Sequence, residues 1–161
     1  LGSNLGSQEE NLRLAAAEMQ KISISPLVAS SIWCSTPEGF GEVVAVFSNA
    51  VVAIEVEMSV DELLLRLKEI EQQLGRARSE SGPYLSRTID LDIIDYDLMV
   101  LKTEGLELPH PRAASRRFVL LPLQEVAPRY HFPGIEHDLE ALIAMAPENP
   151  MRKSSHLNPL G

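Results

Sequence analysis

The stretch SRTIDLDIIDYDLMV places two aspartates where a β-strand would otherwise present hydrophobic side chains. Ile89, Leu91 and Ile93 alternate with the two acidic residues, which is the period of two expected for a strand with one apolar face. Asp90 and Asp92 then share the opposite face, about 7 Å apart by the rise of a strand. Magnesium binds carboxylate oxygens and shares its coordination with substrate phosphates. The spacing therefore predicts a magnesium site, with a solvated face paired to arginines as the alternative.

Cationic residues gather on both sides of this aspartate pair. They all lie between residues 76 and 117 of a chain that is acidic overall, with 14 Lys and Arg against 23 Asp and Glu. Arginine binds phosphate through a bidentate fork. We therefore predict a polyphosphate site, and ion pairs with nearby carboxylates as the alternative for one or two of these side chains. They are Arg76, Arg78, Arg87, His110, Arg112, Arg116 and Arg117.

Length and composition limit the class of protein. The 161 residues fit one domain with a substantial core. A formal charge of −9 argues against non-specific nucleic-acid binding, which needs phosphate neutralisation. The single cysteine, Cys34, cannot form an intrachain disulfide and suits a reducing cytoplasm. No apolar run reaches the roughly 18 residues that a membrane span needs. We expect a cytoplasmic protein that binds neither nucleic acid nor membrane, and that has no P-loop.

The rest of the pattern predicts one α+β domain. Capping boxes at Ser7–Glu10 and Ser59–Glu62 each open an amphipathic helix, and Gly75 ends the second. The β-branched runs predict strands, and a loop rich in Arg, Ser and Gly precedes the aspartates. The last residues look like a flexible tail, so the domain is expected to span 1–150. The expected helices are 8–21, 60–74, 113–121 and 138–146, the strands 28–35, 43–58 and 89–94, the loop 76–88 and the tail 151–161.

Taken together, these motifs resemble the 6-hydroxymethyl-7,8-dihydropterin pyrophosphokinase family of folate biosynthesis. The segments that show this resemblance are, in chain order, LGSNLGS, STPEG, FSNAVV, IEQQLGRAR, RTIDLDI and LPHPRAASRRFVLLPL. The resemblance covers nearly the whole chain, and the joint pattern is far more specific than any one piece. It implies a ferredoxin-like antiparallel sheet with helices packed on it. It also implies a first strand that runs into LGSN from residues upstream of this sequence.

The resemblance further implies a reaction in which the β,γ-pyrophosphoryl group of ATP passes to the hydroxymethyl group of the dihydropterin and AMP is released. Two Mg²⁺ ions would bind at Asp90 and Asp92, and ATP would be a co-substrate. The resemblance also implies catalytic roles for these two aspartates and for Arg76 and Arg87. The resemblance implies ATP contacts from several of the cationic residues and from two residues outside that cluster. These contacts are Glu71, Arg76, Arg78, Arg87, Ile93, His110 and Arg116. The implied pterin contacts are Thr36, Pro37, Phe47, Asn49 and Phe118.

Several alternatives stay open at this point. Phe47 and Phe118 suit stacking on a flat heterocycle, but such residues more often pack in a core. The Asn49 side-chain amide offers both a hydrogen-bond donor and an acceptor. It lies in an apolar run that predicts a strand, and strand interiors disfavour asparagine. A different magnesium-dependent nucleotide hydrolase or transferase could use the same aspartates, and a ferredoxin-like interaction module would have no activity at all. We expect a monomer whose ligands are the two small-molecule substrates.

Overall fold

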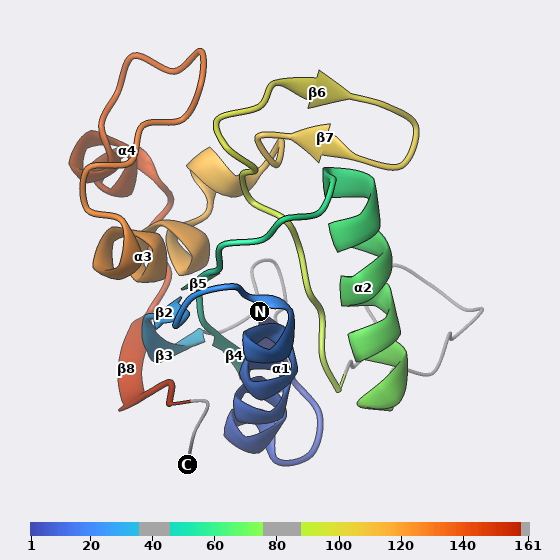
Figure 1. The fold of residues 1–161 in the computed structure, drawn as a ribbon. Helices are drawn as coiled ribbons and strands as arrows, with labels where there is room; N and C mark the ends of the chain where they lie inside the picture. The colour runs from blue at the N-terminus through green and yellow to red at the C-terminus, as the bar shows by residue number, and fades with distance from the viewer. Residues whose placement is uncertain (36–45, 76–87, 159–161) are drawn as a thin grey trace.

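The computed structural model describes residues 1–35, 46–75 and 88–158, and its elements are arranged around small antiparallel sheets (Figure 1). No helix in these ranges is both long and apolar enough to cross a membrane. The helices are α1 (Gln8–Ile22), α2 (Val60–Gln73), the 3-10 turn η1 (Ala113–Ser115), α3 (Arg117–Val126) and α4 (Leu139–Met145). The strands are β1 (Gly2–Ser3), β2 (Val28–Ala29), β3 (Ser31–Ser35), β4 (Phe47–Asn49), β5 (Val52–Ala53), β6 (Leu101–Lys102), β7 (Glu107–Leu108) and β8 (Met151–His156).

The largest sheet has four strands in the order β1-β4-β3-β8, and every neighbouring pair is antiparallel. In its centre Asn49 pairs with Gly2 on one side and with Trp33 on the other. A single bridge joins Gly2 to Asp90, so the aspartate segment runs beside β1. The fold is therefore α+β, as predicted. The ferredoxin-like arrangement stays a prediction, since within the described residues only that bridge joins the aspartate segment to the sheet.

Helix α1 packs against β1 and β4 of the sheet and against α2, and both helices contribute to the main core. The buried face of α1 carries Leu12, Ala15, Ala16 and Met19 at helical spacing, as the sequence predicts. Helix α2 begins with the predicted capping box, in which the Ser59 and Glu62 side chains each bond to the other's backbone N–H. The predicted box at Ser7 is wrong, because its side chain makes no capping hydrogen bond. Helix α1 is thus stabilised by its packing rather than by its cap.

Helices α3 and α4 form a second group, away from α1 and α2 (Figure 1). Their core contains Leu120, Leu123, Leu139 and Leu142 together with Phe132. The predicted helix at 113–121 is divided into η1 and α3, and α3 continues to Val126 with Pro122 inside it. Helix α3 contacts both β3 and β4. This second group therefore covers the sheet beside the strand that carries Asn49.

The two long strands predicted at 28–35 and 43–58 are interrupted. Each divides into a piece in the large sheet and a two-residue piece in the β2–β5 pair. The break lies at Ser30, whose hydroxyl accepts the Val51 N–H at 3.0 Å in place of a backbone partner. Residues 43–45 of the second predicted strand lie outside the described residues.

The C-terminal segment also differs from its prediction as a flexible tail. Residues 151–156 form β8, which pairs with β3 along the edge of the large sheet. The hydroxyls of Ser154 and Ser155 donate to the Glu9 carboxylate on α1, at 2.5 and 2.8 Å. Strand β8 is therefore held by backbone pairing and polar contacts, with little apolar burial. The tail prediction is wrong for these six residues.

Candidate active site

The segment that carries the two aspartates shows the predicted alternation of faces. Ile89, Leu91 and Ile93 are at most 7% exposed and belong to the main core, whereas Asp90 is half-buried and Asp92 exposed. The prediction of a regular strand here is wrong, since only the residue pair Gly2 and Asp90 is bridged. Their backbones exchange two hydrogen bonds, of 2.8 and 2.9 Å. Core packing of the isoleucine and leucine side chains, rather than a full ladder, turns both carboxylates outward.

A buried glutamate fixes the backbone between the two aspartates. Glu71 on α2 is 5% exposed, and its Oε1 accepts the Leu91 N–H at 2.8 Å. This contact holds the Asp90–Leu91 peptide and so fixes the backbone between the two aspartates. From the sequence, Glu71 is predicted only as an ATP contact, and its bond to the backbone is not predicted. No local signal reports that bond, because the two residues are 20 positions apart.

His110 lies within electrostatic range of both Asp92 and Arg116. Its backbone N–H donates to the Ile94 carbonyl at 2.9 Å, which ties it to the aspartate segment. Burial lowers the pKa of His110; the Asp92 charge opposes this shift, while the Arg116 and Arg112 charges reinforce it. Its Nδ1 accepts the Arg112 N–H at 3.2 Å. In a neutral imidazole whose Nδ1 accepts a hydrogen bond, the proton is on Nε2, so Nε2 is a donor.

Arg116 and Phe118 are neighbours at the beginning of α3. The Arg116 guanidinium carbon lies 5.3 Å from the centroid of the Phe118 ring, a cation–π distance. Phe118 is half-buried, as is Phe47 on β4, and neither belongs to the core clusters of the described residues. This placement favours the stacking interpretation of both rings over ordinary core packing. A cationic group and an aromatic face therefore lie together at one helix end.

Asn49 is held in the middle of the large sheet. It is 7% exposed, and its Nδ2 donates to the Ser35 hydroxyl at 3.0 Å. On the other side its Oδ1 would lie 3.4 Å from a Cβ added at Gly2, which is close to an ordinary van der Waals contact. The amide is therefore fixed in orientation. Ser35, which fixes it, is not among the predicted site residues, since register cannot be read from one strand.

Other predicted site residues are not brought to the site by the described structure. Thr36, Pro37, Arg76, Arg78 and Arg87 lie outside the described residues, with the rest of the loop 76–87, so their roles stay predictions. The Ile93 side chain packs in the main core, and any ATP contact there stays a prediction as well.

The described residues contain no group of three or more His, Cys, Asp or Glu side chains that could bind a metal ion by themselves. Magnesium does not need such a group, because it commonly binds one or two carboxylates and completes its shell with water and substrate phosphates. Asp90 and Asp92 supply two carboxylates on the side away from the core. The pair therefore fits magnesium held jointly with a polyphosphate, and does not fit a closed protein site.

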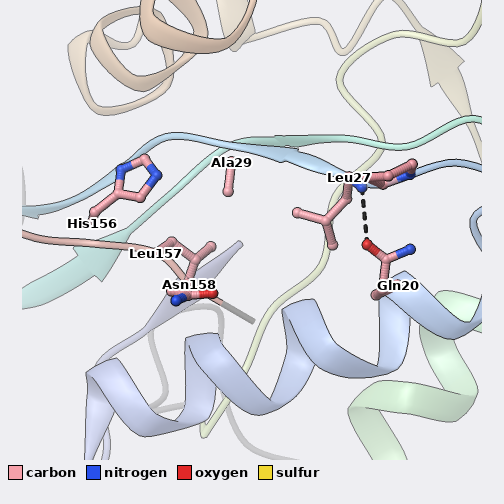
Figure 2. A pocket seen from close by; sticks show the side chains of 7 residues that line it. Gln20, Leu27, Ala29, His156, Leu157 and Asn158 are labelled. Carbon is pink, nitrogen blue, oxygen red and sulfur yellow. Dashed lines mark hydrogen bonds between the residues drawn. The ribbon is translucent and has the colours of Figure 1, made fainter. Parts of the chain in front are cut away.

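One hollow in the described surface lies elsewhere. It is lined by residues from the end of α1, the chain into β2, and the residues after β8 (Figure 2). Gln20 accepts the Leu27 N–H there at 2.9 Å, which Figure 2 draws as a dashed line. None of the predicted site residues lines this hollow. It has no cluster of charged groups, so it is not a candidate for the phosphate chemistry.

Comparison with known proteins agrees with this geometry. A sequence model of the family 7,8-dihydro-6-hydroxymethylpterin-pyrophosphokinase matches residues 1–128. The 2-amino-4-hydroxy-6-hydroxymethyldihydropteridine pyrophosphokinase of Bacillus subtilis is 41% identical over 128 residues, which cover 78% of this chain and 74% of that protein. The protein of the same name from Pseudomonas aeruginosa is 35% identical over 91% of this chain and 89% of its own length. That from Synechocystis is 40% identical, and the match spans 64% of it.

Proposed function

The chain belongs to the 7,8-dihydro-6-hydroxymethylpterin-pyrophosphokinase family, and we propose that it transfers pyrophosphate from ATP to the hydroxymethyl group of 6-hydroxymethyl-7,8-dihydropterin. The products are AMP and the pterin diphosphate, an intermediate of folate synthesis. The observation that carries the proposal is the aspartate pair, which is turned outward by core packing and whose Asp92 lies within electrostatic range of His110, as Arg116 does. An interaction module has no need for such a grouping.

The residues present suit the binding of two magnesium ions with ATP. Asp90 and Asp92 would hold them, since both carboxylates face away from the core. When bound, the ions would neutralise charge on the triphosphate and help to align the reacting groups. Glu71 supports the site from behind by holding the Leu91 N–H at 2.8 Å. The protein thus supplies a fixed pair of carboxylates, and the phosphates supply the remaining ligands.

The reaction forms a bond from the hydroxymethyl oxygen to the β-phosphorus and breaks the bond from that phosphorus to the oxygen retained by AMP. Such a transfer depends on in-line positioning and on stabilisation of charge, without a covalent enzyme intermediate. Asp92, the exposed carboxylate, is suited to accept a hydrogen bond from the attacking hydroxyl. Arg116 and His110 are suited to stabilise charge as AMP leaves, and we assign the same role to Arg76 and Arg87.

The pterin would bind between strand β4 and the beginning of α3. Asn49 offers donor and acceptor groups to the polar edge of the ring, and Phe47 and Phe118 offer faces. Both phenylalanines are half-buried, which leaves part of each ring accessible. We assign Thr36 and Pro37 to the same pocket, and Glu71, Arg78 and Ile93 to ATP. We further propose a monomeric, cytoplasmic enzyme in which residues 1–150 contain every catalytic group.

The products of the reaction test the function directly. We expect AMP to form from ATP only when both magnesium and the dihydropterin are present, in amounts equal to the pterin diphosphate. Chromatography of nucleotides and pterins from the same reaction measures both. Release of ADP, or of AMP without the pterin, would instead show a nucleotide hydrolase and contradict the proposal.

Replacement of Asn49 by Ala should weaken pterin binding much more than ATP binding. Loss of one partner leaves buried polar groups of the ring unpaired, which costs about 1–3 kcal/mol. Calorimetry with the pterin, and separately with a non-hydrolysable ATP analogue and magnesium, measures the two affinities. Ser48→Ala is the matched control, since Ser48 is the neighbouring residue of β4 and its hydroxyl donates to Gln8 on α1. A loss of ATP affinity alone would show that the two pockets have been exchanged.

A further inference from the structure

One carboxylate near the end of α3 binds donors from two strands. Glu125 Oε2 accepts the Ser31 backbone N–H at 2.8 Å, and Oε1 accepts the Trp33 indole N–H at 2.9 Å. The Lys153 ammonium on β8 lies 2.9 Å from the same Oε1 and 5.1 Å from the centroid of the Trp33 ring. A side chain at the surface is rarely held by three donors at once. Glu125 therefore fixes α3 relative to β3 and β8.

The described groups that we assign to the pterin lie on α3 and on β4, the strand that pairs with β3. Phe118 is on α3, two turns before Glu125, because a helix makes a turn in about 3.6 residues. Asn49 is on β4, directly opposite Trp33 in the register of β3 and β4. Helix α3 contacts both strands. The separation of the Phe118 ring from the Asn49 amide thus depends on how α3 is seated on β3.

Glu125 is suited to this role because it stays charged near neutral pH. Burial alone would raise the pKa of Glu125, but the hydrogen bonds from Ser31, Lys153 and Trp33 together lower it. Its side chain is only 25% exposed. Charge-assisted bonds of this kind are shorter and stronger than neutral ones.

We infer that Glu125 is a positioning residue for the acceptor substrate: by holding α3 on β3 it sets the spacing between Phe118 and Asn49, and so the fit of a flat, uncharged pterin ring. The inference rests on the proposed function. Glu125 touches neither substrate, and it acts through the placement of α3. Of the described groups that we assign to the triphosphate, only Arg116 adjoins α3. The two aspartates and His110 lie outside α3 and outside the strands that bond to Glu125, so ATP binding should respond less than pterin binding.

The test compares Glu125→Gln and Glu125→Ala with wild type. We expect the pterin dissociation constant to rise about tenfold in the Ala variant, since small misplacements of binding groups have effects of this size or larger. The Gln variant, which keeps one acceptor oxygen, should lie between the two. The dissociation constant of an ATP analogue with magnesium should rise by a smaller factor than that of the pterin, since only Arg116 among the described ATP groups adjoins α3. Calorimetry measures both constants in each variant.

A second readout shows that the contact itself has been lost. Trp33 is the only tryptophan of the chain, so a nitrogen–proton NMR spectrum contains a single indole N–H resonance, which should shift upfield when Glu125 is replaced. Glu9→Ala is the matched control. Glu9 also joins a helix to β8 through hydroxyl donors, but on α1, which carries none of the assigned pterin groups. It should leave the indole resonance and both affinities unchanged.

The outcomes separate the inference from the function on which it rests. A shifted indole resonance with unchanged pterin affinity would overturn the inference while leaving the enzyme activity established. Equal weakening of pterin binding and ATP binding would show a general loss of structure, and this result would also overturn the inference. If the Ala variant does not fold, the Gln variant decides by the same two measurements. A wild-type protein that binds no pterin would overturn the proposed function itself, and the inference with it.

Discussion

Asp92→Ala and Asp90→Ala should each slow pyrophosphate transfer by at least about a thousandfold, which corresponds to about 4 kcal/mol of barrier. Each carboxylate is proposed to bind a metal ion whose charge neutralisation is needed in the transition state. Neither side chain contributes to the core, and the neighbours Ile89, Leu91 and Ile93 remain to hold the segment. We therefore expect folded, inactive proteins. Initial rates of AMP formation give the activity, and near-ultraviolet circular dichroism gives the fold.

The Asn variants of the same two positions refine this experiment, because Asn keeps the size of the side chain and removes the charge. Asp97→Asn is a matched control in the same segment. Asp97 is exposed and has φ of 50°, a conformation that Asn tolerates well. It should retain wild-type turnover. Near-normal turnover in either Asp90→Asn or Asp92→Asn would exclude the two-metal interpretation.

Arg116→Lys should raise the barrier to transfer by about 1–3 kcal/mol, although the positive charge is conserved. A lysine ammonium cannot make the bidentate fork that a guanidinium offers to a phosphate, and it stacks less well on an aromatic ring. In this protein the guanidinium also lies 5.3 Å from the Phe118 ring centroid. We expect the loss in kcat and in ATP affinity, with pterin affinity nearly constant. Steady-state kinetics with each substrate varied separately makes the distinction.

Arg117→Lys is the control for this substitution, since it is the next residue, at the first position of α3. Full activity in Arg116→Lys would show that only net positive charge is needed at the site. A large loss of pterin affinity in Arg116→Ala would place Arg116 beside the acceptor, and its assignment to ATP would be wrong.

Local signals predict part of this structure well. The capping box at Ser59 and the apolar spacing behind it predict α2, since a helix is specified by residues that lie within one or two turns of each other. The alternation at 89–93 predicts which side chains are buried. It does not predict a strand ladder, because the same alternation arises in any extended segment with one face on a core. The partner of Asp90 is Gly2, and nothing near Asp90 in the sequence indicates it.

The parts that the sequence does not predict are held by distant contacts. The segment MRKSSH has no apolar alternation, and its order comes from pairing with β3 and from hydrogen bonds to Glu9. Glu71 and Glu125 likewise bond to backbone N–H groups far along the chain. A sequence shows that a carboxylate is present but not which amide it will meet. For this reason Glu71 and Glu125 are not predicted as supports of the backbone, while the predictions for Asp90, Asp92 and Asn49 rest on their unusual places in apolar runs.

Strand β8 has a consequence for the synthesis of the protein. Ser154 and Glu9 are 145 residues apart, and β3 has no partner on that edge among the described strands until β8 joins it. Contacts between such distant residues slow folding, because the entropy of a long loop is lost before they form. On the ribosome, β3 therefore emerges long before the strand that covers it. During that interval its open edge is a template for pairing with another nascent chain, and the large sheet is completed only after translation of residues 151–156.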